Sequence, residues 1–258
     1  MLFLGGVVPA LIFGVAMGNV LQGVPFRFDP AMRIFYDGGF FGLLNPFALV
    51  AGLVSVAMLT LHGAAWLVMK TEGTVAQRAA RAGIVAALAT TALYALAGWL
   101  LAHQVPGYQL TSAMPVDGPS NPLLKTAEAV TGGWLSNYQR WPFLWAAPAL
   151  GLALPLLAAA LLAARRGLLA LLVSGFGIAG IILSVGAAMF PFILPSTVDP
   201  RFSLMVWGSS SSHLTLFIML VVTLIFLPIV LAYTSWVFRV LRGKVDTEAI
   251  REDRGHAY

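Results

Sequence analysis

Six long apolar stretches, separated by shorter polar or mixed segments, dominate the pattern of hydrophobic and polar positions along this chain. They cover residues 1–22, 46–69, 82–104, 142–164, 167–192 and 214–238. Each is long enough to cross the hydrocarbon core of a bilayer as a helix, which takes about 20 residues. Because a helix satisfies its own backbone hydrogen bonds inside lipid, the pattern predicts an all-α membrane protein. We expect residues 1–240 to form a polytopic bundle of about six transmembrane helices.

The composition excludes most soluble functions. Apolar residues make up 59% of the chain and charged residues 10%, whereas soluble domains carry about 25% charged residues. The net charge of +5 could suggest a polyanionic partner, but basic residues that set membrane topology explain it better, so we expect no nucleic-acid partner. The chain contains no cysteine, which excludes disulfides, thiolate metal sites and iron–sulfur clusters.

The distribution of lysine and arginine predicts how the helices are oriented. Five basic residues lie in the longer connections, 23–45, 105–141 and 193–213: Arg27, Arg33, Lys125, Arg140 and Arg201. The remaining ten lie in the connection 70–81, in the turn at 165–166 and after the last span. By the positive-inside rule, this second set faces the cytoplasm, together with a C-terminal tail at 241–258. The short turn at 165–167 predicts an antiparallel hairpin of two spans.

Aromatic residues are concentrated in and beside the longer connections. Amphipathic rings collect at the headgroup level of a membrane, so an interfacial belt is one interpretation. A quinone pocket would also use aromatics beside an apolar slot, and composition does not separate the two. The residues concerned are Phe26, Phe28, Phe35, Tyr36, Phe40, Phe41, Tyr108, Trp134, Tyr138, Trp141, Trp145 and Trp207.

Ionisable residues inside a span mark function by default, and here the main candidate is His62. It could serve as an axial haem ligand, but it is the one histidine at mid-membrane depth, and a bis-axial site needs a second ligand. A local hydrogen bond is the competing interpretation. The span cores contain no Asp or Glu, which argues against an ion-coupled transporter. We assign no catalytic residue and no metal ligand, and the cofactor-binding residues stay unknown.

Other polar and small residues indicate helix ends and helix contacts. Asn45 and Pro46 have the residue types of an N-cap and a first helical position. Gly14 and Gly18 have the spacing that lets two helices approach closely. We expect such glycine faces to pack against another membrane subunit, and Gly18 to lie in that interface.

Several segments, in order along the chain, resemble subunit II of bacterial cytochrome bd quinol oxidases. They read GNVLQGVPF at 18–26, FFGLLNPF at 40–47, LWAAPALG at 144–151, AMFPF at 188–192 and SSHLTL at 211–216. Shorter matches lie at 52–56, 120–123 and 133–135. Each match is short, but the ordered set spans nearly the whole chain.

The resemblance implies a non-catalytic, non-haem-ligating subunit of a terminal oxidase that oxidises quinol and reduces dioxygen to water. Its partners would be the haem-bearing subunit I, quinol or quinone, and the lipid of the bacterial inner membrane. Haems b and d would lie on subunit I, and a bound quinone is an additional implied cofactor of the assembly. In this family, quinol protons are released outside without a pump.

One departure from the family concerns the start of the chain. Family members begin with further helices, which include a Trp-Asp motif linked to proton entry, and this sequence starts after that region. We therefore expect a fragment, a misassigned start or one piece of a split gene. Two alternatives to the oxidase subunit are a stand-alone transporter or permease and a truncated fragment without function of its own.

Overall fold

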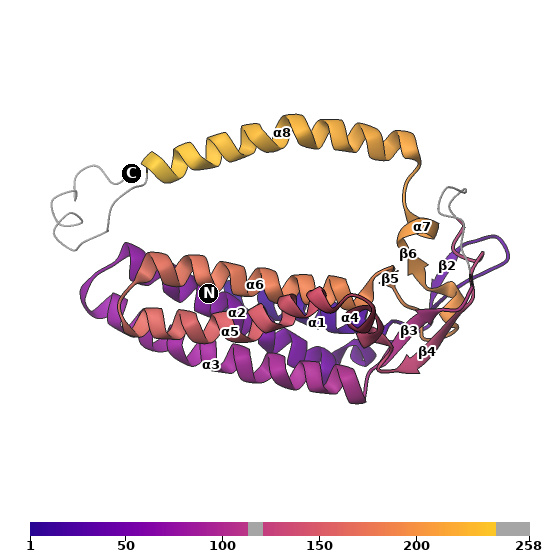
Figure 1. The fold of residues 1–258 in the computed structure, drawn as a ribbon, viewed down its shortest axis with the longest axis horizontal. Helices are drawn as coiled ribbons and strands as arrows, with labels where there is room; N and C mark the ends of the chain where they lie inside the picture. The colour runs from indigo at the N-terminus through magenta and orange to yellow at the C-terminus, as the bar shows by residue number, and fades with distance from the viewer. Residues whose placement is uncertain (113–120, 241–258) are drawn as a thin grey trace.

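The computed structural model describes residues 1–112 and 121–240 of the chain. Within these residues, six helices are long and apolar enough to cross a membrane, which confirms the predicted all-α membrane bundle (Figure 1). They are α1 (Leu2–Gln22), α2 (Pro46–Lys70), α3 (Gly73–His103), α5 (Ala146–Ala163), α6 (Gly167–Met189) and α8 (His213–Val240).

Helices α2, α3, α5 and α6 form a closed four-helix bundle. Each packs against two neighbours, in the order α2, α3, α5, α6 and back to α2. Alanines line the centre, and each of the four helices contributes a completely buried one there: Ala65, Ala87, Ala158 and Ala170. Small side chains let helix backbones approach closely, which is how helices associate in lipid, where burial of apolar surface gives no advantage.

The two remaining spans lie outside this bundle. Helix α1 packs along α2, whereas α8 stands apart from the other helices (Figure 1). None of the described α8 residues is buried. Near its end, the ring of Phe238 lies 5.7 Å from the ring of Trp66 on α2.

Two predicted span limits were wrong. Helix α3 begins at Gly73, so most of the predicted connection 70–81 is helical, because arginines are tolerated on an exposed helix face that extends towards water. The predicted span 167–192 ends at Met189. Pro191 explains the early end, since the residue before a proline is driven away from helical angles.

At one end of the bundle, the long connections fold into a structure that we call the cap. It contains three antiparallel hairpins: β1 (Phe26–Phe28) with β2 (Ile34–Tyr36), β3 (Pro106–Leu110) with β4 (Ala127–Thr131), and β5 (Phe192–Leu194) with β6 (Leu204–Met205). Short helical turns complete it: η1 (Phe40–Leu44), η2 (Gly133–Leu135), α4 (Ser136–Arg140), η3 (Pro142–Trp145), η4 (Pro200–Phe202) and α7 (Val206–Ser209).

The opposite end, which we call the basic end, consists of two tight turns and the end of α8. The turn between α5 and α6 confirms the predicted hairpin at 165–167. The division into a bundle at 1–240 and a tail at 241–258 stays a prediction, and the tail lies outside the described residues.

Candidate functional site

The cap has an aromatic core of its own. Trp134 of η2 is 1% exposed, and its ring centroid lies 5.7 Å from that of Tyr108 and 6.0 Å from that of Phe192. Tyr108 and Trp134 belong to the connection between α3 and α5, and Phe192 to the one between α6 and α8. The two connections pack together with the ends of the spans. The core therefore holds the loops of this end in one arrangement.

This core corrects the interpretation of all the loop aromatics as one interfacial belt. Phe26, Tyr108, Trp134 and Tyr138 are buried, because residues from distant connections cover them. Other members of the set are open to their surroundings, as a belt requires, among them Phe40, Phe41, Trp141 and Trp145.

Hydrogen bonds attach the cap to the ends of α1 and α6. Trp134 Nε1 donates to Leu21 O at 3.0 Å, and Tyr138 Oη donates to Ser184 O at 2.7 Å. Asn137 Nδ2 donates to Ala187 O at 2.9 Å. Leu21 and Ala187 lie in the last turns of α1 and α6, where carbonyls have no partner within the helix. Trp134 and Asn137 therefore satisfy acceptors that would otherwise be unpaired. Ser184 lies before that last turn, so the bond from Tyr138 is a further attachment to α6. Burial raises the pKa of Tyr138 to about 12, and its hydroxyl therefore stays a donor.

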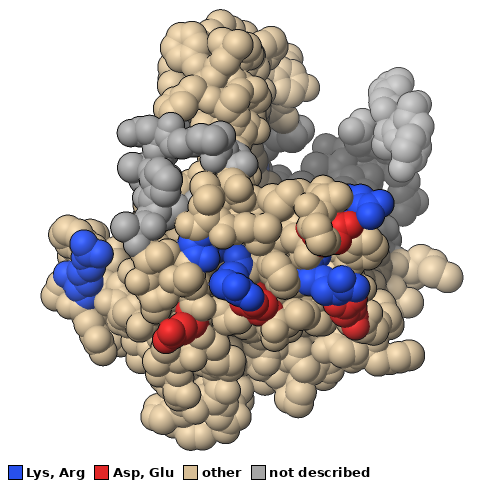
Figure 2. Space-filling view, turned by 90° about the vertical axis from the view of Figure 1, so that its right-hand side faces the viewer, with Lys and Arg blue, Asp and Glu red and all other residues tan. Residues whose placement is uncertain are grey.

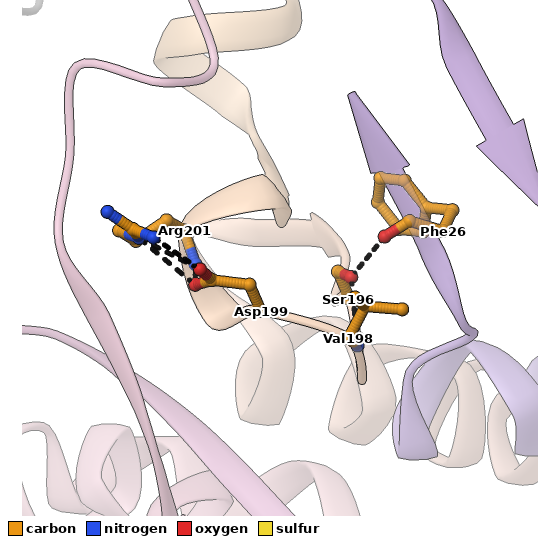
Figure 3. A network of polar contacts seen from close by, with 5 residues as sticks. All are labelled: Phe26, Ser196, Val198, Asp199 and Arg201. Atoms are coloured by element: carbon orange, nitrogen blue, oxygen red, sulfur yellow. Dashed lines mark hydrogen bonds and ion pairs between the residues drawn. The ribbon is translucent and has the colours of Figure 1, made fainter. Parts of the chain in front are cut away.

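A second polar contact joins two hairpins of the cap (Figure 3). Ser196 Oγ donates to Phe26 O at 2.5 Å and accepts from the backbone N–H of Val198 at 3.3 Å. Ser196 is completely buried. The loop after β5 is thereby fixed against β1, although the two segments are 170 residues apart.

Charges differ sharply between the two ends of the molecule. In the cap, three arginines pair with aspartates: Arg27 with Asp37, Arg33 with Asp29, and Arg201 with Asp199, at 2.8, 2.8 and 2.6 Å. Figure 2 shows basic and acidic side chains lying next to each other on this face. The hydrogen bonds from Arg201 lower the pKa of the Asp199 carboxyl. At the basic end, Glu72 is the one carboxylate among the described residues. The basic residues there are Lys70, Arg78, Arg81, Arg165, Arg166 and Arg239.

Lys125, just before β4, is the buried cation of the cap. It is 2% exposed, and its ammonium group donates to Pro122 O. Burial lowers the pKa of this ammonium to about 8, from an ordinary value of 10.5, because removal from water disfavours the charged form.

We expect this shift to make folding stability depend on pH. Between pH 8 and 10.5, the unfolded chain keeps a proton on Lys125 that the folded chain releases. The free energy of unfolding therefore rises with pH in that window, by up to about 1.4 kcal/mol per pH unit from this group. Thermal melting across the window should show the rise, and Lys125→Met should flatten it. Equal slopes in both proteins would contradict the assignment.

His62, the predicted candidate ligand, takes part in a hydrogen bond between two helices. Its Nδ1 lies 2.9 Å from Ser174 Oγ on α6. The hydroxyl proton of Ser174 goes to Leu171 O, at 2.9 Å, so the ring Nδ1–H is the donor to Ser174. The local hydrogen bond that competed with the ligand interpretation is therefore present.

A groove of about 690 Å³ lies beside His62, between α2, α6 and the end of α8. The residues that line it with His62 are Trp66, Leu171, Leu172, Gly175, Phe176, Ala179 and Phe238. None of these is a residue type that ligates haem iron. Among the described residues, there is also no group of three or more His, Asp or Glu side chains that could hold a metal ion. The groove does not fit a haem with two axial ligands from this chain.

The glycine face of α1 lies inside the chain, which corrects the expectation that Gly18 meets another subunit. A Cβ atom on Gly14 would lie 2.6 Å from Gly52 Cα, and one on Gly18 would lie 2.6 Å from Ala48 Cα. Both glycines therefore allow α1 to contact the backbone of α2. The spacing correctly indicated a close helix contact but did not identify the neighbour.

Two asparagines near this helix contact form hydrogen bonds, and one of these bonds was predicted from the sequence. Asn45 Oδ1 accepts from the backbone N–H of Ala48 at 2.8 Å, which confirms the predicted N-cap of α2. Its amide also donates to Asn19 Oδ1 at 3.0 Å. This second bond joins α1 to the start of α2, and the sequence carried no signal for it beyond two polar residues near span ends.

Comparisons with known proteins agree in one description. The family model described as cytochrome bd terminal oxidase subunit II matches residues 1–241. The chain is 43% identical over 258 residues to "Probable cytochrome oxidase subunit 2" of Haemophilus influenzae. It is 42% identical over 257 residues to "Cytochrome bd-I ubiquinol oxidase subunit 2" of Escherichia coli K12. Both alignments cover the whole of this chain and 68% of the relative.

Proposed function

This chain belongs to the family of cytochrome bd terminal oxidase subunit II, and from that premise we propose that it serves as the second membrane subunit of a quinol oxidase. The assembly would oxidise quinol and reduce dioxygen to water. The observation that carries the proposal is the family match, which runs through residues 1–241. The described spans also contain no Asp or Glu, whereas ion-coupled transporters relay protons through carboxylates within the membrane.

We place haems b and d on a partner, subunit I, and give this chain no catalytic residue and no haem ligand. One observation supports this division: the groove beside the ring of His62 offers no second axial ligand. The haems of the assembly would supply the electron transfer. This chain would pack beside the haem-bearing subunit, with its cap attached to the ends of α1 and α6.

We also propose that the basic end faces the cytoplasm of a bacterial inner membrane and that the cap faces outward. The positive-inside rule counts lysine and arginine near span ends. Ten lysines and arginines lie in the connections and tail of the basic end, against five in the longer connections that form the cap, and this difference supports the orientation. The C-terminus would then be cytoplasmic, because α8 ends beside the turn between α2 and α3.

The first test of this assignment is purification in detergent. We expect the chain to copurify with a haem-bearing partner that shows b- and d-type absorption. In the same assembly, His62→Asn should leave both bands unchanged, since asparagine can keep a donor near Ser174 without offering an imidazole. A haem-free preparation that catalyses solute uptake would overturn the function.

A matched variant separates ligation from packing. Ser174→Ala removes the acceptor of the His62 hydrogen bond and keeps the imidazole, at a cost of about 1 kcal/mol of stability. If His62→Asn lost a haem band that Ser174→Ala retained, His62 would be a ligand and the placing of all haem on the partner would be wrong.

A further inference from the structure

An apolar groove runs along the outer face of the bundle between α2 and α3. This open groove has a volume of about 540 Å³, and its lining includes Leu53, Val56, Thr60, Arg81, Val85 and Leu93. We propose that this groove binds one acyl chain of an acidic phospholipid and that the lipid phosphate binds Arg81. The inference concerns only the residues of this chain and does not depend on the oxidase assignment.

Small residues between larger ones create the groove. Ala57, Ala86 and Ala89 form part of its lining, whereas the side chains of Leu53 and Val85 are exposed by 48% and 67%. The hydroxyl of Thr60 donates to Val56 O at 2.7 Å, so it needs no hydrogen bond from a ligand. The walls can therefore accept a hydrocarbon chain without leaving a polar group unpaired.

The length of the groove matches one leaflet of a bilayer. Arg81 and Leu93 both line it, and twelve residues of α-helix rise about 18 Å. Half of a hydrocarbon core of about 30 Å is about 15 Å. A helix of a partner protein would instead cover α3 over most of its 31 residues. A single acyl chain that enters from the basic end fits this length better.

Charge at the mouth of the groove identifies the class of lipid. Arg81 is the one charged residue in the lining, and no ion pair of its guanidinium is found among the described residues. It lies eight residues into α3, about 12 Å from the start of the helix. An exposed arginine near hydrocarbon is costly unless its long side chain reaches headgroups. A phosphate at this level would provide the missing anion, and Arg78 one helical turn away increases the local positive charge.

The test is native mass spectrometry of the membrane assembly purified in detergent. It is titrated with phosphatidylglycerol or with phosphatidylcholine carrying the same acyl chains. Arg81→Gln should weaken phosphatidylglycerol binding about fivefold and leave phosphatidylcholine binding unchanged. Arg166→Gln removes one charge at the same end but outside the groove, and should have little effect. Ala82→Phe, at an exposed lining position, should block the acyl chain and weaken both lipids.

Three results would overturn the proposal. One is unchanged phosphatidylglycerol binding in Arg81→Gln. Another is an equal loss in Arg166→Gln, which would indicate a diffuse surface effect. The third is release of a protein subunit from Arg81→Gln while lipid binding persists, since the groove would then be a protein interface. Melting curves of each variant verify that the bundle remains folded.

Discussion

Trp134→Ala is expected to cause the largest loss of stability among single substitutions in the cap, about 3–5 kcal/mol. The side chain is 1% exposed and lies between Tyr108 and Phe192. Its removal would leave a cavity at the centre of the aromatic core. It would also leave Leu21 O without its donor, now 3.0 Å away, and so loosen the cap from the end of α1.

Two matched variants make this test specific. Trp134→Phe keeps most of the ring volume and loses the hydrogen bond, so we expect a cost of about 1–2 kcal/mol. Trp141→Ala removes a tryptophan that is 52% exposed and should change stability by no more than about 0.5 kcal/mol. Thermal melting in detergent, followed by circular dichroism, measures all three. If Trp134→Ala and Trp141→Ala were equally mild, the cap would have no core at this position.

Gly14→Leu is expected to separate α1 from α2, at a cost of about 3 kcal/mol. A Cβ atom there would lie 2.6 Å from Ala51 O and 2.6 Å from Gly52 Cα. Both are backbone atoms of a helix and cannot move aside as a side chain can. Helix α1 must therefore shift away from α2, and its hydrogen bond between Asn19 and Asn45 should break as well.

Gly6→Leu is the control for this substitution. It makes the same change on the same helix, at a position where a Cβ atom would have no atom of another helix or loop within 4 Å. We expect the melting temperature of Gly6→Leu to equal that of the unsubstituted chain and that of Gly14→Leu to fall. If Gly14→Leu melted normally and lost only its association with a partner, the glycine face would belong to an intersubunit contact after all.

The predictable part of this fold is the part that the bilayer dictates. Stretches of apolar residues must become helices in lipid, and residues such as Asn45 act on a backbone group three positions away. Both signals are local, so the sequence alone shows them. The N-cap of α2 and the six spans were found for this reason.

The cap and the partners of His62 could not be found in the same way. Trp134 Nε1 donates to a carbonyl 113 residues away, and His62 contacts a serine 112 residues away. No periodicity indicates such pairs. The strands of the cap have two to five residues, too few for alternation to distinguish them from loops. The sequence shows that an aromatic residue lies in a loop, but it does not show whether other loops bury its side chain.

Helix α8 illustrates how insertion and assembly can be separate energetic steps. Its backbone groups form hydrogen bonds within the helix, and its apolar side chains are stable in lipid. The helix can therefore cross a bilayer without packing against α2 or α6. Yet none of its described residues is buried against the rest of the chain. The hydrophobicity of α8 therefore keeps the helix in the membrane. It does not determine which face of the helix points towards α2 and α6. Whatever surrounds α8 in the bilayer must supply that information.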